Sequence, residues 1–304
     1  MSRFRAARGV WLGVLIAGAV VLGPPASAAA GARDLLPDLK MKPPAEMRIT
    51  HQATGAGPNR RLLRFTARMV NVGEGPFNVR GHRACATSAC EMSLSQRIRR
   101  SDGSARSVAT DQRARFNVGD GHDHWHVIGV ERYMLIPINV AGDQVVQNTR
   151  SAKVGFCFFD TNANQLSLPG APRSPVYGKP GCATGHPESL RINEGLSVGW
   201  LDLYPWDIAS QWIDTTGLPN GEYLVCETAD PNNAWLETHE NNNEAWSHIR
   251  IDGDHLSQSA SGNGHCAKQV PSAPAALWKI DPAESEPVLF GQSAQVTCVI
   301  ERPA

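Results

Sequence analysis

The fold is decided by residues 61–79, which read R-L-L-R-F-T-A-R-M-V-N-V-G-E-G-P-F-N-V. Phe65, Ala67 and Met69 alternate with polar positions, and this period of two is typical of a half-buried β-strand. Glycine and proline at 73–76 predict a turn, and 77–79 begins a further strand. The stretch therefore predicts a strand, a turn and a second strand.

Short apolar stretches recur along the chain and are separated by glycine and proline. Residues 29–58 are proline-rich and predicted to be extended, and 162–189 are predicted to form a long loop. The pattern favours an all-β fold, an antiparallel β-sandwich core with long loops and few short helices, over alternating βαβ units. The other predicted strands lie at 124–138, 145–148, 152–159, 197–204, 223–228 and 245–251.

The composition excludes several classes of protein. Of 304 residues, 41% are hydrophobic, which is too apolar for a disordered chain, and 28 glycines and 21 prolines argue against a helical bundle. The 29 basic and 29 acidic side chains balance, so the chain lacks the basic field of a general nucleic-acid-binding protein. We therefore expect no nucleic-acid partner.

The first 28 residues are typical of a secretory signal. Three arginines precede an apolar run at 10–22, and Ala-Ser-Ala at 26–28 supplies a cleavage site. The alternative is an uncleaved membrane anchor, but the apolar run is shorter than the about 20 residues that a membrane span requires. We expect cleavage after Ala28, secretion, and a mature chain without a membrane span.

Export changes the interpretation of the seven cysteines. An oxidising compartment favours disulfides over thiols, and the chain has no C-x-x-C pair that would suggest a zinc ribbon. Cys85 and Cys90 are placed to close a short loop, and Cys266 and Cys298 to tie down the end of the chain. Both pairings are hypotheses, because connectivity does not follow from one sequence. An odd count leaves one cysteine free or paired between chains.

Three histidines give the clearest chemical signal, in the stretch D-G-H-D-H-W-H at 120–126. Side chains at i, i+2 and i+4 of a strand face one side, and imidazoles so grouped suit copper, zinc or iron. The alternative is a surface histidine ladder without a metal. The predicted ligands are His122, His124 and His126.

The spacing of these histidines constrains the backbone. On a straight strand the Cα atoms of His122 and His126 would lie about 13 Å apart, near the limit for sharing one ion. We therefore expect a bend or bulge, for which Gly119 and Gly121 are placed. No fixed fourth ligand is evident, and an open coordination position is typical of reactive rather than structural metals.

Several segments, in order along the chain, resemble the lysyl oxidase family. The likeness covers about 35–252, and several motifs in the right order are more specific than any one of them. It predicts a catalytic domain at 29–252 and a C-terminal extension at 253–304. The matching segments are R-R-L-L-R-F at 60–65, H-x-H-x-H at 122–126, S-A-K-V-G-F-C-F-F-D-T at 151–161, G-L-S-V-G-W-L-D-L-Y at 195–204, Q-W-I-D-T at 211–215, G-E-Y at 221–223 and the acidic, Asn-rich 237–243.

The resemblance implies two cofactors, Cu(2+) at the histidines and lysine tyrosylquinone made from Lys153 and Tyr204. By themselves these two residues would be interpreted as an exposed strand lysine and a core aromatic. Alternation along 152–159 places Lys153, Gly155 and Cys157 on one face, and Gly155 is predicted to leave space beside Lys153 for a ring.

The implied activity is that of a secreted copper amine oxidase. It would convert primary amines and molecular oxygen to aldehydes, hydrogen peroxide and ammonia. Peptidyl lysine, polyamines and small amines all remain open as substrates. Asp202 shares a predicted strand face with Tyr204 and is our candidate for the general base, with a purely structural role as the alternative.

A calcium site is also implied, because some family members bind Ca(2+) with the corresponding residues. Oxygen ligands suit calcium. The alternative is an Asn-rich exposed turn. His239 stands where the family usually has aspartate, which removes a charged oxygen. The implied ligands are Asp38, the carbonyl of Leu39, Glu237, Asn242 and Asn243.

Two other functions are kept as alternatives. One is a non-catalytic extracellular module that binds through a metal or calcium, which would tolerate loss of Lys153 and Tyr204. The other is a zinc hydrolase that uses the three histidines and a bound water. It would need a glutamate base, and Glu131 is the nearest in sequence.

Overall fold

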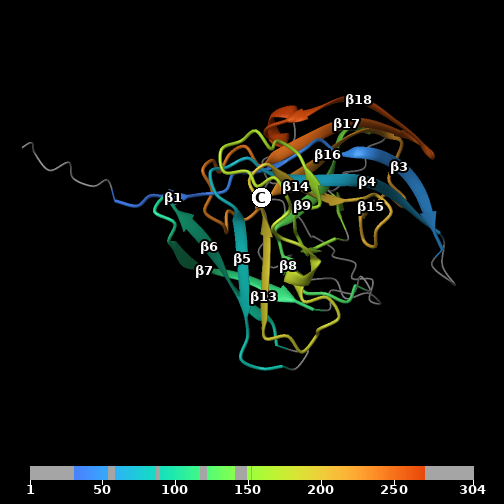
Figure 1. Cartoon of the computed structure of the whole chain (residues 1–304). Coiled ribbons are helices and arrows are strands. Elements are labelled where there is room, and N and C mark those ends of the chain that lie inside the picture. The colour runs from blue at the N-terminus through green and yellow to red at the C-terminus, as the bar shows by residue number, and fades with distance from the viewer. Residues whose placement is uncertain are drawn as a thin grey trace, which may run out of the picture. The chain divides into compact units, whose positions relative to one another are not determined.

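The computed structural model describes residues 31–53, 59–86, 90–116, 122–140, 149–151 and 153–270. The described residues from 33 onward belong to one compact unit, and the description below concerns these residues. The described part of this unit consists of antiparallel sheets and two short 3-10 helices, η1 (Lys179–Cys182) and η2 (Cys266–Gln269) (Figure 1). The prediction of an all-β fold is confirmed. No helix in the described ranges has the length and apolar character needed to cross a membrane.

The first sheet has seven strands and carries the histidine stretch. It runs from β11 through β8, β7, β6 and β5 to β13, and β1 pairs with β6. Figure 1 shows β5, β6, β7 and β13 side by side. The strands are β1 (Asp34–Leu35), β5 (Phe77–His82), β6 (Met92–Arg100), β7 (Ala105–Arg115), β8 (His126–Ile128), β11 (Gly155–Phe156) and β13 (Arg191–Leu196).

Two further sheets complete the fold. One has the order β10 (Thr149–Arg150), β9 (Glu131–Val140), β16 (Gly221–Ala229), β17 (Glu244–Asp252) and β18 (His255–Asn263). The other is built on β4 (Arg60–Asn71), which pairs with several shorter strands. These are β2 (Leu39–Met41), β3 (Ala45–Gln52), β14 (Trp200–Tyr204) and β15 (Trp212–Asp214), and β12 (Asn162–Ala163) pairs with β14.

The core lies where the inner faces of these sheets meet. Phe65, Ala67 and Met69 of β4 are fully buried, as their alternation predicts. They belong to one apolar cluster that includes residues of β5, β9, β14 and β16. Phe65 meets Tyr133 of β9 edge to face, with ring centroids 5.2 Å apart. The alternating stretch at 61–72 is thus the central strand of the core.

The structure departs from the predicted strands at two places near the site. The predicted strand at 124–138 is broken into β8 and β9 because Gly129 has a φ of 75°, a left-handed conformation that few residues other than glycine adopt. Within 152–159 only Gly155–Phe156 pairs as a strand. The predicted strand at 145–148 lies outside the described residues.

Three disulfides tie the described strands and loops. Cys85–Cys90 is as predicted, and Cys157–Cys182 joins the β11 segment to η1. The predicted Cys266–Cys298 pairing is wrong, because Cys266 is bonded to Cys226. Cys226 lies on β16, and β18 returns the chain along β17 so that η2 reaches β16, with the two Cα atoms 6.0 Å apart. Cys298 lies outside the described residues.

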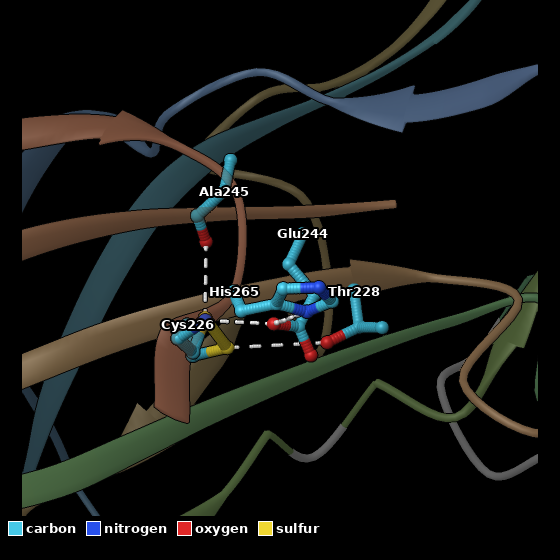
Figure 2. Close-up of a disulfide and its surroundings, with 6 residues drawn as sticks. Cys226, Thr228, Glu244, Ala245 and His265 are labelled. Atoms are coloured by element: carbon cyan, nitrogen blue, oxygen red, sulfur yellow. Dashed lines mark hydrogen bonds and ion pairs between the residues drawn. A yellow bond between two sulfur atoms is a disulfide. The ribbon is translucent and has the colours of Figure 1, made fainter. Parts of the chain in front are cut away.

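The chain therefore continues the sheet beyond residue 252, where the resemblance ended. β18 pairs with β17, and η2 follows it (Figure 1). Figure 2 shows the Cys226–Cys266 bond beside Glu244, whose Oε2 accepts a hydrogen bond from the backbone N–H of Cys266 at 2.7 Å. His265 Nδ1 lies 3.6 Å from the same oxygen. Residues 255–269 are thus attached both covalently and by hydrogen bonds.

We predict that the double substitution C226A/C266A lowers the free energy of unfolding by about 2–4 kcal/mol, because it opens a long loop in the unfolded chain. Urea unfolding under oxidising conditions measures this loss. C85A/C90A is the matched control and should cost less, since its cysteines are separated by 5 residues rather than 40. An equal or larger loss for the control would contradict the expectation.

Candidate functional site

The three predicted histidines lie together at the start of β8. Their rings are grouped, with centroids 4.4–5.8 Å apart, and each offers a ligand nitrogen within 4.8 Å of the others. His126 is fully buried, while His122 and His124 are partly exposed. Three imidazoles in this arrangement are a donor set that fits Cu(II).

The histidines converge because the backbone bends rather than running straight. Asp123 and His124 lie in a bend, and β8 begins only at His126. The predicted bend is therefore confirmed at 123–124, whereas Gly119 and Gly121 lie outside the described residues.

Trp125 anchors the histidine stretch in the core. Its side chain is fully buried, its indole N–H donates to the carbonyl of His186 at 3.2 Å, and the Arg83 guanidinium lies 4.3 Å from its ring centroid. Its backbone N–H donates to the carbonyl of Cys182 at 2.9 Å. A buried residue between two metal-ligand candidates fixes the backbone from which both project.

Gly155 makes room for His126, and this corrects the role predicted for it. A Cβ atom at Gly155 would lie 2.7 Å from the Cβ of His126, closer than such atoms approach. The two residues meet because β11 pairs with β8. The expected free space beside Lys153 is thus filled by the histidine, and the glycine allows the close approach.

Lys153 and Tyr204 are brought together in the interior. The Nζ of Lys153 lies 4.8 Å from the centroid of the Tyr204 ring, and Lys153 is only 5% exposed. An exposed strand lysine is therefore ruled out. Tyr204 is held from two sides, by its hydroxyl donating to the carbonyl of Cys157 at 3.1 Å and by edge-to-face packing on Phe156.

Buried carboxyl groups surround this pair. Asp202 lies on β14 with Tyr204 and is 1% exposed, and burial raises the pKa of its carboxyl to about 7 against the opposing effect of the Tyr204 hydroxyl. Burial, followed by the nearby Asp202 charge, raises the pKa of Tyr204. Asp202 is therefore a carboxyl that can exchange a proton near neutral pH.

Glu131 lies on the same inner face and was predicted only as a hydrolase base. Burial raises the pKa of its carboxyl to about 8, although the Tyr133 hydroxyl donates a hydrogen bond to it. It interacts electrostatically with Asp202 and Lys153. Glu227, opposite Tyr133 in the β16–β9 pairing, is fully buried, and burial raises its pKa as well. Sequence patterns singled out Asp202 and Glu131 separately but gave no signal that they cluster with Glu227, because the three acids come from three strands.

The residues of the implied calcium site also come together. Asn242 donates to Asp38 Oδ1 at 2.9 Å, Asn243 donates to Glu237 Oε1 at 2.7 Å, and the Leu39 backbone N–H donates to Glu237. Burial raises the pKa of Glu237 to about 9.

His239 contributes a nitrogen to the same corner, with Nδ1 3.1 Å from Asp38 Oδ2. It is Leu39's N–H, not its carbonyl, that contacts Glu237. Hydrogen bonds among protein groups thus hold this corner together, and calcium binding there stays a prediction.

Comparison with known proteins identifies the same family that the sequence motifs resemble. The family model described as Lysyl oxidase matches residues 88–260. Lysyl oxidase homolog 2 of Gallus gallus is 30% identical over 138 residues, and lysyl oxidase homolog 4 of Mus musculus is 26% identical over 199 residues. These segments cover 45% and 65% of this chain but only 15% and 20% of the relatives. The likeness therefore concerns one part of much longer proteins.

We predict that G155A weakens Cu(II) binding about 10–100-fold, because the added methyl group displaces His126. Equilibrium titration of the metal-free protein with Cu(II) measures the change. G178A is the control, since its new methyl group meets only Pro180 Cδ at 3.6 Å, an ordinary contact. Unchanged copper affinity in G155A would argue against His126 as a ligand.

We also predict that E131Q makes stability less dependent on pH. The folded state keeps the Glu131 proton up to pH about 8, whereas the ordinary pKa is 4.5, so the free energy of unfolding falls as pH rises between these values. The slope from this group reaches about 1.4 kcal/mol per pH unit. Urea unfolding of the metal-free protein at pH 5–8 should show a shallower slope for E131Q and an unchanged slope for E222Q, which alters an exposed glutamate of β16.

Proposed function

The chain belongs to the lysyl oxidase family, and we propose from this premise that it is a copper-dependent amine oxidase acting on primary amines. The observation that carries the proposal is the buried contact of Lys153 Nζ with the Tyr204 ring, 4.8 Å from its centroid. The substrate would be peptidyl lysine, a polyamine or a small amine. The products would be an aldehyde, hydrogen peroxide and ammonia.

The buried lysine supports an enzyme over a non-catalytic binding module. Lys153 is 5% exposed, and its Nζ lies against the ring of Tyr204, the residue with which it would form the cofactor. A module that binds through the histidines or the Asp38 corner has no need of a lysine packed on a tyrosine. We therefore favour an enzyme over a non-catalytic binding module.

Different residues of the chain have different roles in the proposed reaction. Cu(2+) at His122, His124 and His126 and a lysine tyrosylquinone from Lys153 and Tyr204 would supply the oxidising chemistry toward the amine and molecular oxygen. Phe156 packs against both Lys153 and Tyr204, and this contact restricts where the two side chains can lie relative to each other.

Asp202 is our proposed general base. It lies two residues from Tyr204 on β14, and its ionised carboxylate would accept the proton from the carbon next to the substrate nitrogen. A pKa of about 7 gives it both protonation states at neutral pH. The raised pKa of Glu131 keeps that group protonated at neutral pH, and its hydrogen bond partner is Tyr133. No contact of Glu131 favours a zinc hydrolase.

We further propose that the chain is exported and that its leader at 1–28 is removed. Three disulfides between described cysteines support an oxidising compartment. We also propose that calcium binds as a structural ion. Its ligands would be Asp38, the Leu39 carbonyl, Glu237, Asn242 and Asn243.

Intact-mass and peptide analysis of protein matured with Cu(II) and air tests the function. We expect a cross-linked peptide pair containing Lys153 and Tyr204, and a hydrazone adduct after phenylhydrazine. K153R and Y204F should bind copper but yield neither product, because each lacks one half of the cross-link. Wild-type protein that holds copper with both residues unlinked would overturn the proposal and favour a binding module.

A further inference from the structure

A cationic face lies on the outer side of β5, β6 and β13. Arg80 of β5, Arg97 and Arg99 of β6 and Arg191 of β13 are all exposed. Alternation along β6 buries Leu94 and its even-numbered neighbours, so the odd-numbered arginines point outward. Pairing of Arg80 with Ser95, and of Asn193 with Arg80, places the three strands next to one another. We call these four residues the arginine face.

Within the described residues, these four guanidinium groups form no ion pair or hydrogen bond. Other arginines of the same sheet are neutralised. Arg106 pairs with Asp34, and Arg115 pairs with Glu91. Like charges gathered on one face raise the local potential and attract anions. The acid nearest to Tyr177 is Asp160, which is buried and accepts hydrogen bonds from the backbone N–H groups of Val176 and Tyr177.

Two cavities open on this face and follow each other along β5 and β13. The larger, of about 600 Å³, is lined by Arg80, Arg191 and Asn193. The smaller, of about 230 Å³, is lined by Arg97, Arg99 and Tyr177. Each cavity therefore has two of the four arginines in its wall. Positions 78 and 82 of β5, which line the smaller and the larger cavity, are about 13 Å apart along the strand.

Tyr177 lines the smaller cavity. A Cβ atom at Gly195 would lie 2.4 Å from the tyrosine ring, so the ring rests directly on the β13 backbone. Arg80, Arg97 and Arg99 all interact with it electrostatically. Val176 is 64% exposed beside it. The wall of the smaller cavity thus offers aromatic and aliphatic atoms beside its two arginines.

We propose that the arginine face binds an extended acidic polysaccharide. Guanidinium groups match carboxylate or sulfate oxygens through two parallel hydrogen bonds, and two pairs of arginines fit negative charges spaced along a chain. The ring of Tyr177 and the side chain of Val176 would pack against the CH face of a sugar in that chain.

The polar groups on the face favour a sugar polymer over a protein. Asn193 accepts a hydrogen bond from Asn78 through Oδ1, which orients its amide nitrogen for a hydroxyl partner. Ser95 and Ser107 lie on the same side of the neighbouring strands. Protein partners are usually anchored by several buried aromatic or aliphatic side chains, and this face offers one ring.

The inference stands apart from the amine oxidase proposal, because its four arginines lie on β5, β6 and β13, whereas His126 lies on β8 and Lys153 and Tyr204 are buried. An enzyme held on an acidic polymer would keep its buried site free for a separate amine. The net charge of the whole chain is zero, so the attraction is local rather than a general cationic effect.

The test is calorimetric binding of the full chain to polygalacturonate and to dextran sulfate, with uncharged dextran as the blank, at physiological ionic strength. We expect saturable binding to at least one of the two anionic polymers and none to dextran. R97S/R99S and R80S/R191S should each weaken binding by about tenfold or more, since each removes one guanidinium pair. R97K/R99K keeps the charge but loses the paired geometry and should fall between these values.

R250S is the matched control, because it removes one exposed arginine from β17 in another sheet. It should bind like wild type, and each variant's thermal unfolding confirms that it is folded. Equal weakening by R250S and by R97S/R99S would show that only the net charge matters and would overturn the proposal. Absence of binding to both polymers, or binding of poly-glutamate but neither polysaccharide through the same arginines, would also overturn it.

Discussion

The Cys157–Cys182 disulfide is the link on which the site depends. Cys157 accepts the Tyr204 hydroxyl through its carbonyl, and Cys182 accepts the Trp125 backbone N–H through its own. One covalent bond therefore connects the segment that accepts the Tyr204 hydroxyl to the segment that accepts the Trp125 N–H of the histidine stretch. Neither β11 nor η1 is long enough to fix this geometry alone, because they have two and four residues. Reduction of this bond would loosen both halves of the site at once.

The interior around Lys153 gathers acidic side chains whose burial raises their pKa values. Asp202, Glu131 and Glu227 lie on facing strands and are nearly inaccessible to solvent. Three ionised carboxylates so placed would repel one another and lose their hydration, so burial raises all three pKa values. The cluster therefore holds protons beside Lys153, which under the proposed function would have to lose a proton to act as a nucleophile. This is a physical reason for acids to occupy positions that apolar side chains would otherwise fill.

Sequence patterns predicted the features that depend on the alternation and spacing of nearby residues. Neighbouring residues in the sequence were enough to predict the burial of Met69 on β4, the bend at His124 and the Cys85–Cys90 disulfide. The approach of Lys153 to Tyr204 was implied by family resemblance alone. The β6–β7 hairpin was missed because most of β7 is partly exposed and lacks a clear apolar face. The partner of Cys266 depends on how β17 and β18 stack in space, which spacing along the chain does not contain.

Opposite faces of one sheet meet opposite requirements, and the alternation of β6 shows how. Ile98 points into the core, while Arg97 and Arg99 point to solvent, so a shift of one residue would bury two guanidinium groups. Each inward position is apolar or, like Gln96, fully hydrogen-bonded: its amide bridges the Leu236 backbone at 2.8–2.9 Å. The register of β6 is therefore fixed from inside by packing, and the outer face is left free to carry unpaired charge. That division lets a neutral chain present a cationic surface on one side of a sheet whose other side packs into the apolar core.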